Sequence, residues 1–256
     1  MIPLATAAGV EPVELSTKAV YTRLREAILR GEFDPHVPIS QVQLSRQLGV
    51  SRTPLREALR MLQREGLIES EPNRRVRVSV MSIADLEQLY AMRVVLETLG
   101  LRLSFRGFVE EDFRILDECM VGMERHSGGD VDAWEEVHHV FHEQFHKYAG
   151  TRIIQLLRQL SDYTMRYRRS YLAEPVAWVR AAAEHRAILE ACKASDLSEA
   201  TSELARHLSR TALSLIASAD PAHDPAAVRE ALRQVTDSNE AVTVDGTTPR
   251  RRPAEL

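Results

Sequence analysis

The sequence predicts a mainly α-helical protein built in two parts. Three short helices and a β-hairpin are expected over residues 16–80, followed by an all-α bundle of six long helices over residues 82–219. Three observations support this prediction. Ala, Leu, Arg and Glu, which favour helices, dominate the composition. Apolar residues recur with a helical period along most of the chain, and a short stretch near residue 70 alternates between apolar and polar residues.

The first part is predicted from its periodic segments and the breaks between them. Residues 17–30 carry one apolar stripe, which stops at the Gly and Pro residues of "GEFDPHVP". "SQVQLSRQLGV" reads as a short helix closed by Gly49, and a third helix begins near Thr53 and ends near Gly66. "LIESEPNRRVRVSV" then predicts a hairpin around Glu-Pro-Asn. Helix, helix, helix and hairpin in this order form a winged helix-turn-helix.

The second part is predicted from long helical patterns with short connections. The expected helices cover residues 82–106, 110–126, 131–149, 152–172, 176–194 and 196–219. Six helices of this length joined closely imply a bundle. Residues 1–15 lack periodicity and are expected to be a disordered arm. Residues 220–256 include one short helical pattern but otherwise have the composition of a largely disordered tail.

The third helix has two different faces. Leu55, Ala58, Leu59 and Leu62 fall on one side, and Arg52, Arg56, Arg60, Gln63 and Arg64 fall on the adjoining side. The hydroxyls of Ser51 and Thr53 gather at the helix N-terminus, where free N–H groups attract phosphate. Arginine suits bidentate contact with guanine, and recognition helices read bases with their N-terminal residues. An ordinary amphipathic helix would show the same pattern alone, but the turn before it and the hairpin after it favour DNA binding.

Charge is divided unevenly along the chain. The net charge is −4, but residues 1–80 hold 12 Lys/Arg against 9 Asp/Glu, whereas residues 81–256 hold 21 against 28. A mildly basic first part on an acidic second part fits a chain in which only the first part meets nucleic acid. Two cysteines exclude a disulfide scaffold, and no apolar run approaches the ~20 residues of a membrane span. We therefore expect a cytoplasmic protein.

"GVSRTPLREALRMLQREGLI", preceded by "AILRGEFDP", closely resembles the winged helix-turn-helix of the GntR family of bacterial transcription regulators. The resemblance implies that Arg52 and Arg56 face bases and that Ser51 and Thr53 lie near phosphate. The family usually has Gly after Arg at the tip of the wing, where this chain has Arg75. Arg74 or Arg75 is therefore expected to make the wing's contact with DNA.

The second part is rich in histidine: six of nine lie between residues 138 and 207. His138, His142 and His146 are four residues apart on one helical stripe. "HEQFH" also matches the H-E-x-x-H pattern of zinc proteases, so a zinc-dependent hydrolase that uses His142, Glu143 and His146 is the alternative function. Metal binding without hydrolysis is the other hypothesis, because helices of a bundle can bring histidines to one point. Imidazoles that pack in the core or at the surface would also account for the pattern.

Residues 82–219 resemble the all-helical FCD effector domain that follows the DNA-binding domain in one GntR subgroup. The pieces that carry the resemblance are "YAMRVVLETLGLRLS", "FHEQFHKYAG", "EHRAILEACKASDLSEA" and "RHL". The resemblance implies a divalent metal ion, zinc or nickel, held by His142, His146, His185 and His207, with His142 where the family usually has Asp. It also implies that Arg93 grips a small carboxylate effector, although an Arg93–Glu97 surface pair would equally explain this arginine.

Together, the two resemblances predict a DNA-binding regulator rather than an enzyme. The expected protein is a homodimer that binds a palindromic operator in double-stranded DNA, and repression is the expected form of control. A small organic acid in the metal-containing pocket is expected to switch the geometry of the dimer. The sequence does not specify the operator, the pathway, the acid or the metal.

Overall fold

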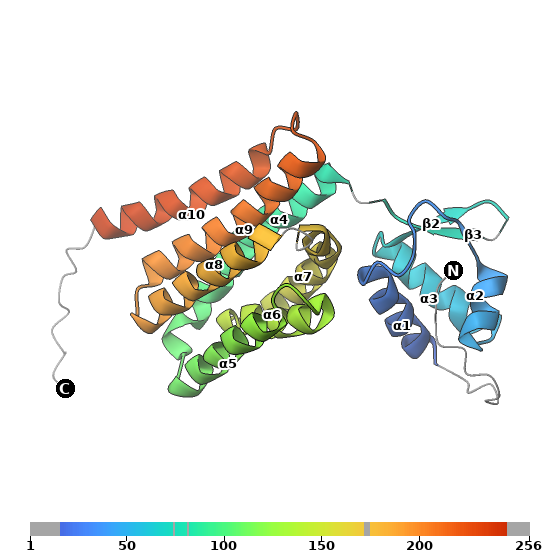
Figure 1. Cartoon of the computed structure of the whole chain (residues 1–256), viewed down its shortest axis with the longest axis horizontal. Helices are drawn as coiled ribbons and strands as arrows, with labels where there is room; N and C mark the ends of the chain where they lie inside the picture. Colours follow the sequence, from blue (N-terminus) through green and yellow to red (C-terminus); the bar gives the residue numbers. More distant parts are fainter. Residues whose placement is uncertain (1–15, 74, 81, 172–174, 245–256) are drawn as a thin grey trace, which may run out of the picture. The chain divides into compact units, whose positions relative to one another are not determined.

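The computed structural model describes residues 16–73, 75–80, 82–171 and 175–244 (Figure 1). The chain divides into two compact units, Met1–Ser82 and Ile83–Leu256, which we call the N-terminal and C-terminal units. The predicted fold class, a winged helix-turn-helix followed by a helical bundle, is confirmed. None of the described helices is long and apolar enough to cross a membrane.

The N-terminal unit contains three helices and a small sheet. Its elements are α1 (Thr17–Leu29), β1 (Ile39–Ser40), α2 (Gln41–Leu48), α3 (Arg52–Arg64), β2 (Ile68–Glu71) and β3 (Arg75–Val78). The strands are antiparallel in the order β1-β3-β2, so β3 lies in the middle. The two-residue strand β1 was not predicted, because it is too short to show an alternating pattern. Asn73, at the turn of the hairpin, adopts a φ of 60°, a conformation that Asn tolerates better than most residues.

Local chemistry sets the ends of the helix-turn-helix. The Ser16 and Ser40 side chains accept hydrogen bonds from the backbone N–H groups of Ala19 and Gln43, capping α1 and α2. Gly49 ends α2 with a φ of 66°, and Ser45 donates to the carbonyl of Val50 across the turn at 2.6 Å. The turn therefore fixes α3 on a core formed by Val20, Leu24, Ile28, Leu44, Leu55, Leu59, Leu62, Val76 and Val78.

The C-terminal unit is a bundle. Its helices are α4 (Ile83–Ser104), α5 (Glu110–His126), α6 (Val131–Phe145), α7 (Thr151–Tyr171), α8 (Pro175–Lys193), α9 (Leu197–Ala219) and α10 (Ala226–Val244), with a 3-10 turn at Phe105–Gly107. The first six match the predicted helices, although α6 ends four residues early. Over the described residues the bundle therefore has seven helices, one more than predicted.

The short helical pattern expected at residues 224–235 forms the first part of α10, and the prediction of disorder after it is wrong for residues 236–244. Figure 1 shows α10, in red, running along α9 and α4. Val228, Ala231 and Val235 lie on one face of α10 and are buried. The Asn239 side chain donates to the Ser198 carbonyl and to Ser202 Oγ. Packing against helices far away in sequence thus overcomes the weak helix propensity of "TDSNEAVTV". Residues 245–256 of the predicted tail and the predicted arm at 1–15 lie outside the described residues.

Candidate DNA-binding surface and metal centre

Helix α3 buries one face and exposes the other, as its sequence pattern predicts. Leu55, Ala58, Leu59 and Leu62 are buried against the core. Arg52, Arg56, Arg60 and Gln63 are exposed. Within the N-terminal unit Arg52 and Arg56 are exposed: Arg56 pairs with Glu57 of its own helix, 3.7 Å away, and its side chain is 60% exposed. The helix therefore presents a cationic ridge to solvent.

This ridge borders a groove of about 510 Å³ in the N-terminal unit. Its lining includes Arg52, Thr53, Arg56, Arg60 and Gln63 from α3, and Gln41 from the start of α2. The Ser70 hydroxyl of β2 donates to the side-chain oxygen Oε1 of Gln63 at 3.1 Å and so links the wing to α3. Apolar residues, among them Val42 and Val76, also line the groove, and its three arginines suit the phosphates and base edges of a duplex.

The other predicted DNA-contact residues lie around the same helix end or at the wing. Ser51 is the N-cap residue of α3, but its side chain makes no capping hydrogen bond, so its hydroxyl is not committed to the helix. Thr53 is exposed beside it. Arg75 is exposed at the start of β3, next to the turn of the hairpin. Arg74 lies outside the described residues.

Four buried histidines of the C-terminal unit meet in one cluster. His138 and His142 come from α6, His185 from α8 and His207 from α9, and one ligand nitrogen of each lies within 4.8 Å of those of the others. The ring centroids of His185 and His207 are 4.5 Å apart, as are those of His138 and His142. We call these four residues the histidine cluster.

The cluster differs from the predicted ligand set by one residue. His142, His185 and His207 come together as expected, but His138 occupies the place expected for His146. The predicted helical stripe contains His138, His142 and His146, and each step of four residues along a helix moves a side chain about 6 Å along the axis. His146 follows the end of α6 and packs instead on α4, where a Cβ built on Gly100 would lie 2.8 Å from its own Cβ.

Burial and hydrogen bonds prepare these imidazoles as ligands. Burial lowers the pKa of His142 to about 3, although its contact with Glu97 acts in the opposite direction. Burial also lowers the pKa of His138 and His185 well below the usual value. Neutral imidazole is the form that binds a metal ion. Nε2 of His142 and of His185 are buried without a hydrogen-bond partner in the described part of the chain.

Buried carboxylates contact Nδ1 of two of these imidazole rings, on the side away from Nε2. Glu97 of α4 lies 3.1 Å from Nδ1 of His142, and Glu184 of α8 lies 2.8 Å from Nδ1 of His207. A third carboxylate, Glu135, stands 3.9 Å from Nδ1 of His138, beyond hydrogen-bond length. None of these three was predicted as a site residue, apart from Glu97 as a surface partner of Arg93.

Two buried arginines lie beside the cluster. Arg93 donates to Glu97 at 2.7 Å and to the Thr164 hydroxyl at 2.8 Å. Arg168 donates to both oxygens of Glu135, from a terminal nitrogen at 2.7 Å and from Nε at 3.1 Å. The Arg93–Glu97 pair is thus interior, not the helix-surface pair considered from sequence. Arg168 was missed, although it continues the buried α7 stripe that contains Leu157, Leu160 and Thr164.

The geometry does not support the hydrolase alternative. Glu143, the residue that would act as general base, pairs with Arg158 and with His139, which lie outside the histidine cluster. His146 is not part of the cluster either. The H-E-x-x-H match is therefore a consequence of the spacing of histidines along α6.

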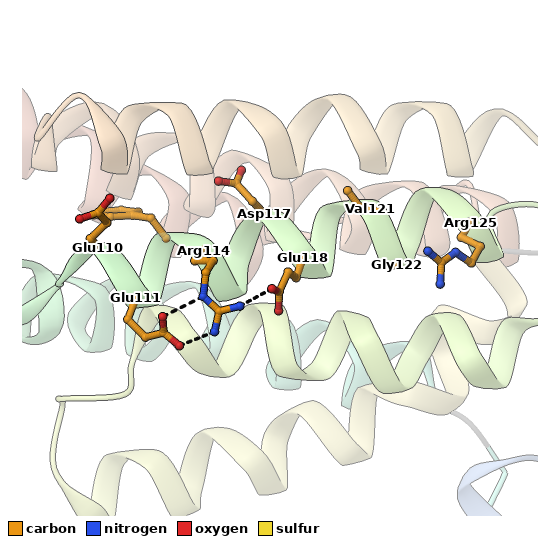
Figure 2. A pocket seen from close by; sticks show the side chains of 9 residues that line it. Glu110, Glu111, Arg114, Asp117, Glu118, Val121, Gly122 and Arg125 are labelled. Atoms are coloured by element: carbon orange, nitrogen blue, oxygen red, sulfur yellow. Dashed lines mark hydrogen bonds and ion pairs between the residues drawn. The ribbon is translucent and has the colours of Figure 1, made fainter.

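A groove of larger volume, about 940 Å³, runs along α5, and Figure 2 shows the residues that line it. Glu110, Glu111, Asp117 and Glu118 line it together with Arg114 and Arg125. Arg114 already pairs with Glu111 and Glu118, as the dashed lines in Figure 2 mark. No residue of the histidine cluster lines this groove, so it is separate from the candidate metal centre.

The fold and its cationic helix define the class of protein: a DNA-binding transcription regulator with a second, all-helical domain. The family model "Bacterial regulatory proteins, gntR family" matches residues 16–78, and the model "FCD domain" matches residues 88–210. The chain belongs to the GntR family of bacterial transcription regulators and carries an FCD domain. It is a regulator, not an enzyme.

Known relatives agree with this assignment. An HTH-type transcriptional regulator from the TAR-I ttuE-ttuC' intergenic region of Agrobacterium vitis is 33% identical over 132 residues, covering 49% of this chain and 75% of the relative. The transcriptional repressor GlaR of Escherichia coli is 26% identical over 198 residues, covering 73% of this chain and 90% of the relative. The solved structure of E. coli McbR/YncC shares the fold, with a TM-score of 0.69 at 22% identity over 80% of this chain and 98% of that one.

Proposed function

We propose that this protein is a transcriptional repressor, a homodimer that binds a palindromic operator and releases it when a small organic acid binds beside a metal ion in the C-terminal unit. The observation that supports the proposal is the combination, in one chain, of the exposed arginines of α3 with the buried histidine cluster. The name of the relative GlaR supports repression as the form of control. Binding to chromosomal DNA would place the protein in the bacterial cytoplasm.

In this proposal Arg52 and Arg56 read base edges in the major groove. Both lie in the first turns of α3, where a recognition helix makes its base contacts, and guanidinium forks match guanine. Ser51 and Thr53 would contact phosphate next to the N-terminus of the helix. Arg75 would contact the backbone or the minor groove from the wing.

The proposed second copy covers an apolar face of α4. Met92, Val95, Leu99 and Leu103 are exposed at intervals of three or four residues, and Leu103 is 52% exposed. Helix α4 also buries its opposite side, so it is apolar nearly all round, as is typical of helices enclosed on every side. A twofold dimer through this face would give the symmetry that a palindromic operator requires.

The histidine cluster fits a divalent metal ion. Four neutral imidazoles form a nitrogen donor set that suits zinc or nickel better than manganese or magnesium. The unpartnered Nε2 atoms of His142 and His185 are the buried polar atoms that such an ion would satisfy. When bound, the ion would supply a positive charge that attracts a carboxylate. His138, His142, His185 and His207 would hold it.

A carboxylic acid fits the groups around the cluster. Arg93 and Arg168 are buried, and the hydroxyl of Tyr90 has no hydrogen-bond partner among the residues that the structure describes. Guanidinium groups bind carboxylates through paired hydrogen bonds. An entering acid would compete with Glu97 and Glu135 for these arginines. Helix α4 carries Arg93 and Glu97 and begins at Ile83, directly after the N-terminal unit, so a shift of α4 is the proposed route to the DNA-binding domain.

Operator release is the test of this function. Fragments of genomic DNA that the purified protein retains would define the operator, which is then titrated in gel shifts with zinc-loaded protein and a panel of small organic acids. We expect tight binding without acid and a weaker affinity with at least one acid. Failure to retain any DNA would refute the regulator. If zinc-loaded protein binds the operator and no acid changes its affinity, the proposed release by an acid would be refuted, but DNA binding would not.

A further inference from the structure

The carboxylates behind His142 and His207 share one arrangement. In each case a histidine of the cluster faces a glutamate, and the same glutamate is bound by an arginine. Glu97 joins His142 to Arg93, and Glu184 joins His207 to Arg210. The two sets of contacts involve different helices, since Glu97 lies on α4 and Glu184 lies on α8. The repeated arrangement suggests a common role.

That role follows from the hydrogen-bonding chemistry of the groups. An ionised carboxylate only accepts hydrogen bonds, so Nδ1 of the facing imidazole must donate the proton. Nε2 of the same ring then keeps its lone pair and can bind a metal ion. Nε2 of His142 is buried and has no hydrogen-bond partner among the described residues. The carboxylate therefore selects the tautomer and fixes the orientation of the ring.

In each set of contacts the arginine orients the glutamate by binding one of its two oxygens. Arg210 binds one oxygen of Glu184, which leaves the second oxygen directed at His207. Arg93 does the same for Glu97 and its contact with His142. Because each carboxylate forms an ion pair with a guanidinium, it faces the imidazole as a charged acceptor. The third carboxylate, Glu135, binds Arg168 with both oxygens and lies too far from His138 to do this.

We propose that Glu184 and Glu97 are positioning residues that lock His207 and His142 as Nε2 ligands for the metal ion of the proposed function. Neither glutamate touches the ion itself. The proposal rests on the proposed metal site and adds a requirement to it: the four histidines alone do not give full affinity.

The test uses Glu184, because it lies nearer the surface than Glu97 and its arginine is partly exposed. Glu184→Ala is compared with Glu203→Ala in the full-length protein. Glu203 pairs with Arg206 on α9 at 2.6 Å and, among the described residues, forms no hydrogen bond or ion pair with a histidine of the cluster, so it is a matched control. Zinc dissociation constants are measured by competition with a chromogenic chelator. We expect Glu184→Ala to weaken zinc binding about 10–100-fold, with Glu184→Gln between it and the wild type, and the control unchanged.

A second measurement does not depend on metal. In the zinc-free protein, nitrogen NMR shifts of His207 should show the Nδ1–H tautomer, and Glu184→Ala should convert it to a mixture or to Nε2–H. Wild-type zinc affinity and an unchanged tautomer in Glu184→Ala would overturn the proposal. A lower melting temperature without either change would indicate a merely structural role and would overturn it as well. Absence of zinc binding by the wild type would instead refute the proposed metal site, while the tautomer measurement would still decide the role of Glu184.

Discussion

Arg93 and Glu97 form an ion pair 2.7 Å long in the interior of the bundle, and Glu97 also contacts His142. Buried ion pairs often add little stability, because removing two charges from water offsets their attraction. The pair is better explained by its position, since one carboxylate links an arginine to a candidate metal ligand. A change at the histidine cluster can therefore reach α4 through a single side chain.

The first prediction concerns base recognition. Arg52→Ala should weaken operator binding by about 1–3 kcal/mol and relax sequence preference, because a guanidinium that reads a base is lost. The matched control is Arg64→Ala, an exposed arginine at the C-terminal end of the same helix that does not line the groove. Gel-shift titrations on operator and on scrambled DNA measure both effects. Full operator affinity in Arg52→Ala would contradict the assignment.

The second prediction concerns the dimer. Leu103→Glu should convert the protein to a monomer, because it places a charge in the apolar face of α4. Operator affinity should then fall roughly 10²–10⁴-fold, since the two half-sites are no longer bound together. The control is Val179→Glu on α8, where the valine is 75% exposed outside that face. Light scattering after size exclusion gives the mass; a dimeric Leu103→Glu protein would place the interface elsewhere.

The third prediction concerns the metal. Zinc or nickel at 100 times its dissociation constant should raise the free energy of unfolding by about 2.7 kcal/mol. His185→Ala should abolish this gain, whereas His139→Ala, on α6 but outside the cluster, should retain it. Manganese and magnesium should have little effect, because the donors are imidazoles. Thermal melts with elemental analysis check each point, and equal stabilisation of wild type and His185→Ala would rule out the site.

The fourth prediction concerns pH and Asp112, a buried residue at the start of α5. It accepts hydrogen bonds from Lys147, Tyr148 and the backbone of Val109. Although burial raises the pKa of Asp112, the contacts with Lys147, Val109 and Tyr148 lower it below the usual value. Because the pKa of Asp112 is lower in the folded than in the unfolded state, its ionised carboxylate stabilises the fold above the unfolded pKa of about 3.9. This stabilisation is lost as the pH falls through the lower folded pKa.

Asp112→Asn should therefore destabilise the protein by about 1–3 kcal/mol at neutral pH, because buried donors lose their charged acceptor. The difference from wild type should shrink below about pH 4, where the unfolded-state carboxyl takes up a proton. Asp117→Asn, which removes an exposed partner of Lys193, should change stability by less than about 1 kcal/mol. Urea unfolding at several pH values measures this, and a pH-independent difference would contradict the charge-based explanation.

The sequence predicts the N-terminal unit well, because local signals and packing agree there. Gly49 ends α2, and the leucines of α3 mark its buried face without reference to distant residues. The strand β1 escapes prediction because only its pairing with β3 defines it. Local sequence patterns therefore suffice to predict helix α3, which exposes Arg52 and Arg56.

The histidine cluster is predicted less completely. Spacing places His138, His142 and His146 on one stripe but cannot tell which two meet the histidines of α8 and α9. In the structure His138 and His142 do so, and His146 does not. Arg168 and Glu184 could be found only once their helix faces were known to point inward. The second part of α10, residues 236–244, is the largest omission, since this helix packs against α4 and α9, which are distant in sequence.

The position of α10 has a practical consequence for work on the isolated effector domain. Val228, Ala231 and Val235 cover apolar surface on neighbouring helices, and Glu87 of α4 accepts a hydrogen bond from the Ala227 N–H at 2.7 Å. A fragment cut after residue 219 would expose that surface to water and leave Glu87 without this donor. Expression boundaries for crystallisation or ligand screening should therefore extend through Val244, beyond the end of the FCD match.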